Sequence, residues 1–247
     1  MCEDCGCGDP GLVPVEVHEH LLADNGTRAA HLREHFVESH VLAINLMGSP
    51  GSGKTAVLEA TARAFAGKHR LGAVSGDLAT DRDARRLEAA GLTARAITTG
   101  NACHLDARMV HDALHHMAWR DLDMFFIENV GNLVCPAIYD LGQAANVVAL
   151  AITEGEDKPL KYPVMFQHAD LVLLTKMDLL PHLDVDLGAI HDALARVMPD
   201  PRVISVSSKT GEGIAEWLTW LEVRARIAPR SSDLASLRIN RAEPPTY

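Results

Sequence analysis

Long apolar runs, a basic N-terminus and a surplus of positive charge are all missing from this sequence, and each absence excludes a class of protein. No hydrophobic stretch approaches the roughly 18 residues that a helix needs to cross a bilayer. The first residues are cysteines and acids rather than a basic region and an apolar stretch, so we expect no signal peptide. A formal net charge of -10 disfavours nonspecific binding to nucleic acid. We expect a cytoplasmic protein with neither a membrane nor a nucleic-acid partner.

Cysteine is scarce but concentrated. Of the five cysteines, three (Cys2, Cys5 and Cys7) fall within the first seven residues. Thiols crowded this closely, in a chain without a signal peptide, favour metal binding or redox chemistry over a disulfide framework. The thirteen histidines are scattered and form no polyhistidine tract, so we expect most of them to be ordinary surface or helix residues.

Short apolar runs alternate with helical patterns from residue 41 onward, after one or two helices expected within 15–38. Strands that alternate with helices predict an α/β domain built on a mostly parallel sheet with helices on both faces. Ligands should then bind beyond the carboxyl ends of the strands. We expect strands at 41–47, 71–75, 94–98, 124–127, 146–153, 170–175 and 202–207, and helices at 54–66, 81–90, 105–118, 184–198 and 212–226.

The segment GSPGSGKT, residues 48–55, fits the phosphate-binding pattern G-x-x-x-x-G-K-[ST] between a strand and a helix. Lys54 would reach the β- and γ-phosphates, and the Thr55 hydroxyl would ligate Mg²⁺. A plain glycine turn before a helix is the alternative reading, but it does not require the complete motif. Backbone N–H groups around the phosphates would come from Gly48, Gly51, Ser52 and Gly53.

Two later segments indicate which base is bound. LLTKMD resembles the [NT]-K-x-D guanine motif of GTPases, in which the Asp178 carboxylate would accept hydrogen bonds from guanine N1–H and the 2-amino group. Thr175 replaces the commoner asparagine, and Lys176 would lie along the base. SVSSKTGEG resembles the last guanine-contacting loop, with contacts from Ser207, Ser208 and Lys209. The order of these motifs predicts GTP as the nucleotide, with GDP as the product.

A third segment, MFFIENVGN, resembles the carboxylate-x-x-Gly switch of P-loop GTPases. We expect Glu128 near Mg²⁺ or its waters and the Gly131 N–H near the γ-phosphate. Asp77 ends the second expected strand, where it would hold Mg²⁺ or orient the attacking water, or instead cap the following helix. No glutamine stands beside Gly131 to position water, so we expect a slow intrinsic GTPase that acts as a switch, with Lys54, Asp77 and Glu128 as its catalytic groups.

Cys103, His104 and Cys135 follow strands whose carboxyl ends face one surface, so they form a plausible soft site for Zn²⁺ or Ni²⁺. Small buried thiols with a helix-cap histidine, or a Cys–His nucleophilic dyad, are the alternatives. In the tail, Cys2, Cys5 and Cys7 (C-x-x-C-G-C) suit Ni²⁺, although Zn²⁺, Cu⁺ or redox chemistry would also use them.

Taken in order, these motifs resemble the hydrogenase nickel-incorporation GTPases, the HypB family, a relative of the urease accessory GTPases. The likeness runs from Met1 to about residue 225, through CEDCGCG, NLMGSPGSGKT, TTGNACHLDA, IENVGNLVCPA, TEGEDKPLKYP and TKMDLLP. It implies a P-loop NTPase fold of the SIMIBI GTPase type. We divide the chain into a cysteine tail (1–14), a helical segment (15–40), a GTPase domain (41–228) and a C-terminal tail (229–247).

The resemblance also implies a function: delivery of Ni²⁺ for [NiFe]-hydrogenase assembly, with other maturation proteins and the hydrogenase large-subunit precursor as partners. It implies a homodimer when GTP is bound, with Cys103, His104 and Cys135 as metal ligands shared at the interface. Cys2, Cys5 and Cys7 match the N-terminal nickel motif of some members. Because Cys135 lies four residues beyond Gly131, we hypothesise that the nucleotide gates metal affinity.

Three rival functions remain at this stage. A nickel chaperone for another enzyme, such as urease, is the nearest. A P-loop kinase for a small metabolite, with zinc as structure only, would need an acceptor-binding domain that the sequence does not suggest. A plain metal-storage protein leaves Lys54, Thr55 and Asp178 unexplained.

Overall fold

The computed structural model describes residues 15–100 and 102–227, and over this range seven strands form one parallel sheet in the order β3-β2-β4-β1-β5-β6-β7. Every neighbouring pair runs parallel, with Ile44 of β1 aligned with Phe126 on one side and Ala145 on the other. The strands are β1 (Leu42–Met47), β2 (Leu71–Asp77), β3 (Thr93–Thr98), β4 (Met124–Glu128), β5 (Ala145–Ala151), β6 (Leu171–Thr175) and β7 (Val203–Ser205).

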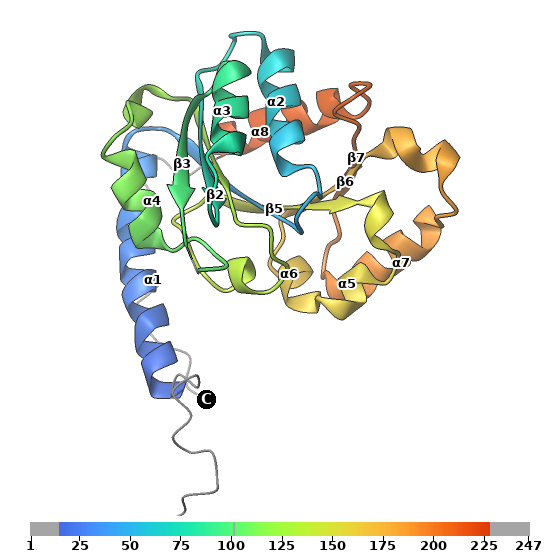
Figure 1. Cartoon of the computed structure of the whole chain (residues 1–247), viewed down its shortest axis with the longest axis horizontal. Coiled ribbons are helices and arrows are strands. Elements are labelled where there is room, and N and C mark those ends of the chain that lie inside the picture. Colours follow the sequence, from blue (N-terminus) through green and yellow to red (C-terminus); the bar gives the residue numbers. More distant parts are fainter. Residues whose placement is uncertain (1–14, 101, 228–247) are drawn as a thin grey trace, which may run out of the picture.

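Helices cover both faces of this sheet (Figure 1). The α-helices are α1 (Val15–Glu38), α2 (Lys54–Phe65), α3 (Arg82–Ala89), α4 (Ala107–Leu114), α5 (Lys158–Lys161), α6 (Pro163–Gln167), α7 (Leu187–Val197) and α8 (Ile214–Ile227). Short 3-10 turns are η1 (Trp119–Asp121), η2 (Cys135–Ala137), η3 (Ile152–Glu154) and η4 (Met177–His182).

The core has one layer on each side of the sheet because successive strand residues point to opposite faces. On one face, β1 residues such as Ile44 pack with α2, α3 and α8 through Phe65, Leu87 and Trp217. On the other face, Ala43 packs with α1 and α4, while Val148 of β5 belongs to the layer that includes α6 and α7. In this part of the chain no helix is long and apolar enough to cross a membrane.

The expected alternation of strands and helices is confirmed, but α5, α6 and the short 3-10 turns were not among the expected elements. The other differences lie at element ends. Helix α1 runs without a break, and its buried Leu32 and Phe36 pack onto the sheet. The helix expected at 105–118 is shorter, because α4 begins at Ala107 after the Asp106 side chain accepts the N–H of Met109 at 2.7 Å. Residues 103–106 are therefore free to form a loop at the carboxyl edge of the sheet.

Candidate nucleotide and metal sites

The phosphate-binding loop lies between β1 and α2. Gly48, Gly51 and Gly53 have φ values of 144°, 76° and 94°, a backbone region that side chains rarely adopt. At Gly48 a Cβ would also lie 2.3 Å from the Ala149 carbonyl oxygen. The Lys54 Nζ donates to the carbonyl oxygens of Gly48 and Ser49 at 3.1 and 3.0 Å. Burial lowers the pKa of Lys54, while the Glu128 carboxylate opposes that shift.

Thr55 and Glu128 form the buried floor of the site. The Thr55 hydroxyl donates to Glu128 Oε1 at 2.6 Å, and Glu128 is only 3% exposed. Burial raises the pKa of Glu128, and no described residue supplies a hydrogen bond to its Oε2. Both residues line a cavity of about 480 Å³ together with Lys54, Asp77 and Gly131. A buried carboxylate with an unpaired oxygen beside a threonine hydroxyl fits Mg²⁺, a hard cation that takes oxygen ligands.

Asp77 does not cap the following helix, which corrects one of the two roles expected for it. Its Oδ1 accepts the N–H groups of Ala79 and Thr80 at 2.9 and 2.7 Å, while Asp81 occupies the N-cap position of α3. These backbone hydrogen bonds lower the pKa of Asp77 and keep it ionised. The carboxylate thus lines the same cavity as Thr55 and Glu128 from a fixed local turn.

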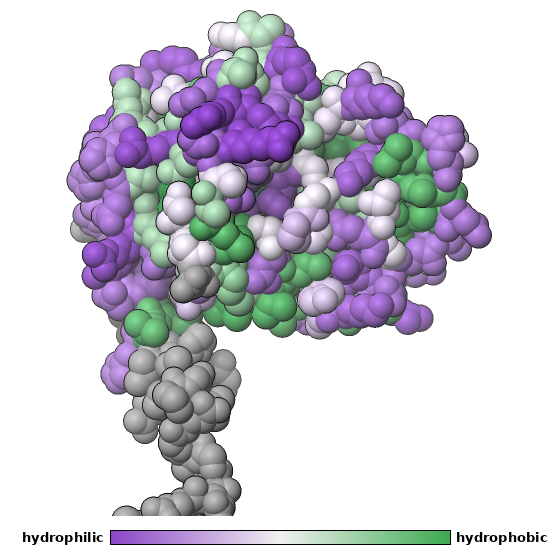
Figure 2. Space-filling view, in the orientation of Figure 1, coloured by the Kyte–Doolittle hydropathy of each residue, from purple (hydrophilic) through white to green (hydrophobic). Residues whose placement is uncertain are grey.

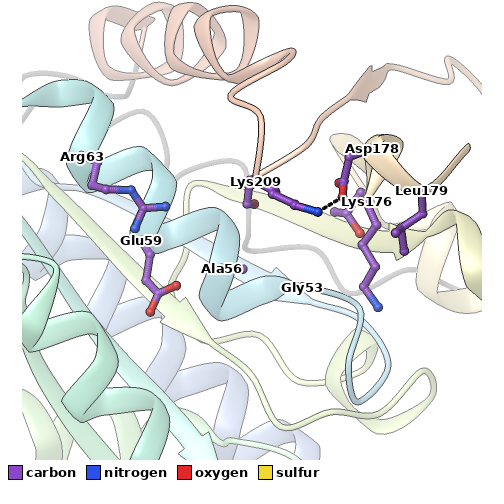
Figure 3. Close-up of a pocket in the computed structure, with 10 residues that line it drawn as sticks. Gly53, Ala56, Glu59, Arg63, Lys176, Asp178, Leu179 and Lys209 are labelled. Atoms are coloured by element: carbon purple, nitrogen blue, oxygen red, sulfur yellow. Dashed lines mark ion pairs between the residues drawn. The ribbon is translucent and has the colours of Figure 1, made fainter.

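A second cavity, of about 330 Å³, brings the expected base-binding residues together (Figure 3). Asp178 Oδ1 accepts the Ser207 hydroxyl at 2.7 Å, and Lys209 Nζ lies 3.9 Å from Asp178 Oδ2. Lys176 has a left-handed backbone with φ of 63°. Figure 3 shows its side chain extending along the pocket beside Leu179. Ser208 also lines the cavity.

Thr175 lines this pocket at its junction with the phosphate-binding loop. Its hydroxyl donates to the Ser52 carbonyl oxygen at 2.6 Å, and the residue is 2% exposed. The threonine that replaces the commoner asparagine therefore connects the end of β6 to the phosphate-binding loop.

Cys103, His104 and Cys135 converge as expected, with donor atoms all within 4.8 Å of one another. The two Sγ atoms lie 3.1 Å apart, and His104 Nδ1 lies 3.9 Å from Cys103 Sγ. Burial lowers the pKa of His104, which keeps a nitrogen lone pair available for a metal. Burial and the Cys103 thiol raise the pKa of Cys135, so a bound cation would compensate its thiolate. Cys2, Cys5 and Cys7 lie outside the described residues.

The packing alternative for these thiols fits poorly, because each of the three side chains is only half-buried. A nucleophilic dyad would also need a hydrogen bond closer than the 3.9 Å between Cys103 Sγ and His104 Nδ1. The His104 imidazole instead stacks on the Tyr139 ring, with centroids 3.8 Å apart and planes 20° from parallel. Tyr139 therefore fixes the orientation of the imidazole, a role that the sequence motifs did not predict.

Two asparagines missed by the motif analysis join the nucleotide and metal sites. The Asn132 N–H donates to the Gly48 carbonyl at 3.2 Å, and its side-chain amide donates to the Cys103 carbonyl at 3.3 Å. Asn129 Oδ1 accepts the N–H of Leu105 at 3.1 Å. Asn132 directly follows the expected switch glycine, Gly131, and Asn129 precedes it by two positions. This closeness to the switch motif was the only feature of the sequence that could have indicated their roles.

Comparison with known proteins agrees with this geometry. Residues 42–205 match the family described as CobW/HypB/UreG, nucleotide-binding domain. Hydrogenase maturation factor HypB of Azotobacter chroococcum mcd 1 is 50% identical over 228 residues, covering 88% of this chain and 74% of that protein.

Two crystal structures have the same architecture over most of the chain. HypB from Archaeoglobus fulgidus has a TM-score of 0.77 at 37% identity, covering 83% of this chain and 100% of that one. HypB from Helicobacter pylori, solved in complex with nickel, has a TM-score of 0.77 at 38% identity, covering 82% and 95%. The chain therefore belongs to the HypB family of hydrogenase maturation factors, within the CobW/HypB/UreG group of P-loop nucleotide-binding proteins.

Proposed function

We propose that this chain is a GTP-hydrolysing nickel metallochaperone that delivers Ni²⁺ to [NiFe]-hydrogenase during maturation, with the nucleotide gating metal binding. The observation that carries the proposal is that one short segment, residues 128–135, connects the nucleotide site to the soft metal site. Glu128 at its start belongs to the Mg²⁺-compatible floor, and Cys135 at its end belongs to the soft metal cluster. A change at the γ-phosphate would therefore be transmitted through only a few residues.

The choice of GTP is supported by the pocket around Asp178. Ser207 and Lys209 hold this carboxylate at the edge of the base cavity, where guanine offers two donors. Adenine would present an acceptor there and leave the carboxylate unpaired, a mismatch of the kind that costs roughly 10⁴-fold in binding. Mg²⁺ would be held by Thr55 and Glu128, with Asp77 nearby, and would neutralise charge on the phosphates.

Hydrolysis would use Lys54 toward the β- and γ-phosphates, the Gly131 N–H at the γ-phosphate, and Asp77 or Glu128 to orient water. Gly131 has no room for a side chain, because a Cβ would lie 2.9 Å from Pro50 of the phosphate-binding loop. Val130 and Asn132 flank it, so no glutamine is adjacent to place the attacking water. The intrinsic rate should therefore be slow.

Dimerisation would complete the soft metal site. Cys103, His104 and Cys135 supply three donors, and a tetrahedral ion such as Zn²⁺ takes four, whereas Ni²⁺ accepts N/S sets of varied geometry. Val134 and Ile138, which flank Cys135, are 48% and 45% exposed. Figure 2 shows apolar residues gathered on the lower part of the face that it displays. Exposed apolar side chains next to an incomplete metal site suit contact with a second copy.

Delivery would involve other hydrogenase maturation proteins and the large-subunit precursor of the hydrogenase. The reducing cytoplasm suits this role, because Cys103 and Cys135 are free thiols. Their sulfur atoms are close enough to form a disulfide in an oxidising compartment. The tail cysteines Cys2, Cys5 and Cys7 would form a separate nickel site.

The test compares Ni²⁺ and Zn²⁺ affinities, metal stoichiometry and oligomeric state in the GDP form and in a form bound to non-hydrolysable GTP. It uses a reductant that does not bind metal. We expect the two nucleotide states to differ in affinity and in dimer fraction, and Cys103→Ala to abolish that difference. Identical affinities and identical oligomeric states in the wild-type protein would reject nucleotide gating.

A further inference from the structure

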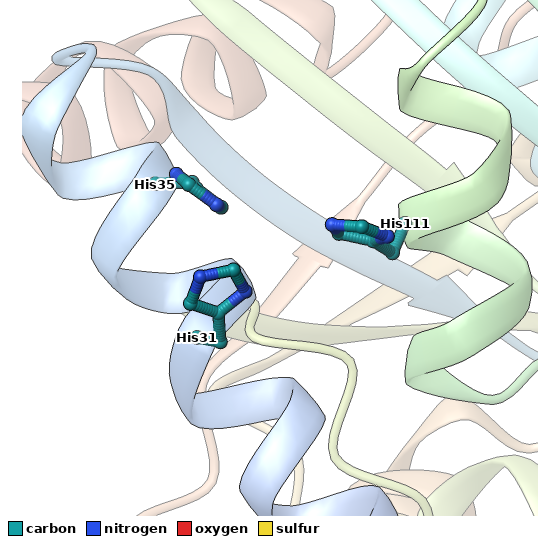
Figure 4. Close-up of side chains that lie close together, drawn as sticks. All are labelled: His31, His35 and His111. Atoms are coloured by element: carbon teal, nitrogen blue, oxygen red, sulfur yellow. The ribbon is translucent and has the colours of Figure 1, made fainter.

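Three histidines from two helices meet away from the nucleotide and metal sites described above. His31 and His35 lie on α1, and His111 lies on α4, with one ligand atom of each within 4.8 Å of the others. Figure 4 shows His31 and His35 projecting from one helix toward His111 on the other. The ring centroids are 4.2 Å apart for His31 and His35, 6.0 Å for His31 and His111, and 6.4 Å for His35 and His111.

The arrangement follows from helical spacing and from a fixed helix pair. Residues four apart lie on the same face of a helix, which puts His31 and His35 one turn apart. Helices α1 and α4 lie side by side at one end of the sheet (Figure 1), and between them Leu32, Phe36 and Val110 are fully buried or nearly so. The backbones that carry the imidazoles are thus held by the core, so small side-chain rotations suffice to converge the donors.

The local chemistry suits a cation that accepts nitrogen donors. Burial lowers the pKa of His35 and of His111, and the neighbouring imidazoles act in the same direction. Neutral imidazoles offer lone pairs. Asp112 Oδ1 lies 3.9 Å from His111 Nδ1, and a carboxylate there favours the tautomer whose Nε2 is free to ligate.

The charges around the cluster are mixed. Arg28 and Arg108 line a cavity of about 230 Å³ beside His31 and His111. Each arginine faces a carboxylate on its own helix, Arg28 with Asp24 at 2.9 Å and Arg108 with Asp112 at 3.8 Å. The arginine charges are therefore partly offset. The remaining positive charge would favour water or an anion as an additional ligand of a metal bound by the three histidines, and would disfavour a second metal ion.

We propose that His31, His35 and His111 bind one divalent transition-metal ion, of the Zn²⁺ or Ni²⁺ class, at a site separate from Cys103, His104 and Cys135. Three imidazoles and one open position match a metal site with nitrogen and oxygen ligands and a coordination number of four or more. His31 is exposed, so an ion can reach the cluster from solvent. His115, at the C-cap of α4, has its ring centroid 4.5 Å from that of His111 and is not one of the three converging donors. The proposal does not depend on nickel delivery or on the bound nucleotide.

Co²⁺ is the probe that distinguishes this site from the thiolate sites. In the full chain with Cys2, Cys5, Cys7, Cys103 and Cys135 all replaced by serine, we expect one equivalent of Co²⁺ to bind. The spectrum should show visible d–d bands and no sulfur-to-cobalt charge-transfer band. Adding His31→Gln, His35→Gln and His111→Gln should remove both the bands and the bound ion.

The control carries the same number of changes at exposed histidines outside the cluster, His20→Gln, His168→Gln and His191→Gln, and should bind Co²⁺ unchanged. Because the serine background itself could perturb the fold, Zn²⁺ stoichiometry is also measured on the protein with all its cysteines, with and without the three cluster substitutions. We expect the cluster variant to bind one ion fewer at unchanged circular dichroism. Equal stoichiometry in both proteins, or Co²⁺ that survives the cluster substitutions, would overturn the site and leave the histidines as packing residues.

Discussion

Asn132 donates its side-chain amide to the Cys103 carbonyl at 3.3 Å while its own N–H donates to the Gly48 carbonyl at 3.2 Å. One residue therefore touches both the phosphate-binding loop and the loop that carries two metal donors. A displacement of Gly131, which precedes it in the chain, would move both contacts together. Coupling between two sites requires such a shared element with two arrangements.

Asn132→Ala should reduce the difference in Ni²⁺ affinity between the GDP form and the non-hydrolysable GTP form. Nucleotide measured without metal should bind nearly as in the wild type, because the backbone N–H that Asn132 donates to Gly48 is retained. The Asn132 side chain also hydrogen-bonds the Cys135 thiol, so Ni²⁺ affinity should shift by a similar factor in both nucleotide states, and only the difference between the states reports the coupling. Isothermal titration of Ni²⁺ in both nucleotide states gives the coupling directly. Asn132→Asp is the matched variant: it keeps the acceptor for the Val134 N–H and loses the donor to Cys103. Full coupling in both variants would remove Asn132 from the mechanism.

Glu128→Gln should stabilise the protein without Mg²⁺ and abolish stabilisation by Mg²⁺ and nucleotide together. The carboxylate is 3% exposed with Oε2 unpaired among the described residues, and glutamine keeps the shape of the side chain while removing the buried charge. Burial raises the folded-state pKa of Glu128 above the ordinary 4.5. The folded state then binds more protons than the unfolded one, so stability falls as pH rises from about 4.5 through the folded value.

Thermal unfolding across this pH range, with and without Mg²⁺, checks the argument. The wild type should lose stability with rising pH in the absence of the cation more steeply than Glu128→Gln does. Thr55→Val, which removes the partner hydroxyl but keeps the charge, should be less stable than the wild type. If Glu128→Gln instead destabilises the Mg²⁺-free protein, its carboxylate is a structural group and not a strained cation ligand.

The sequence predicted the alternation of strands and helices and the parallel sheet correctly, and the reason is physical. Strands buried on both faces read as continuous apolar runs, and the helix faces repeat every three to four residues, so elements and sheet type follow from local pattern. Element ends depend on single contacts instead. Asp106 ends the loop before α4 by capping Ala107–Leu114, two residues later than expected.

Residues that act through tertiary contact were the ones missed. Asn132 and Tyr139 have no motif of their own, and their roles appear only when β1, β4 and the 103–106 loop are brought together. The three-histidine cluster is similar. His111 is 76 positions beyond His35, and only the packing of α1 on α4 shows that their faces meet. The spacing of His31 and His35, four residues apart, was the one local signal.

Asp178→Asn should weaken GTP binding and improve binding of xanthosine triphosphate. The carboxylate would accept two guanine donors, whereas the asparagine amide would donate to the 2-oxo group that xanthine carries in place of the 2-amino group. Fluorescent-nucleotide competition measures both affinities. Lys209→Ala removes the amine that lies 3.9 Å from the Asp178 carboxylate and leaves the carboxylate in place. It should weaken GTP binding without changing the base preference. Unchanged preference in Asp178→Asn would mean that this pocket does not read the base.

Thr175→Val should destabilise the chain by about 1 kcal/mol and weaken GDP binding, because Thr175 lines the base pocket and braces the phosphate-binding loop. Its hydroxyl is the 2.6 Å donor to the Ser52 carbonyl, and the substitution leaves that buried acceptor unpaired in the phosphate-binding loop. Thr175→Ser keeps the donor and should retain most of both properties, which separates the hydrogen bond from the loss of volume. Chemical denaturation and GDP titration of the two variants supply the comparison. A valine variant with wild-type stability and wild-type GDP affinity would show that the bond to Ser52 contributes nothing.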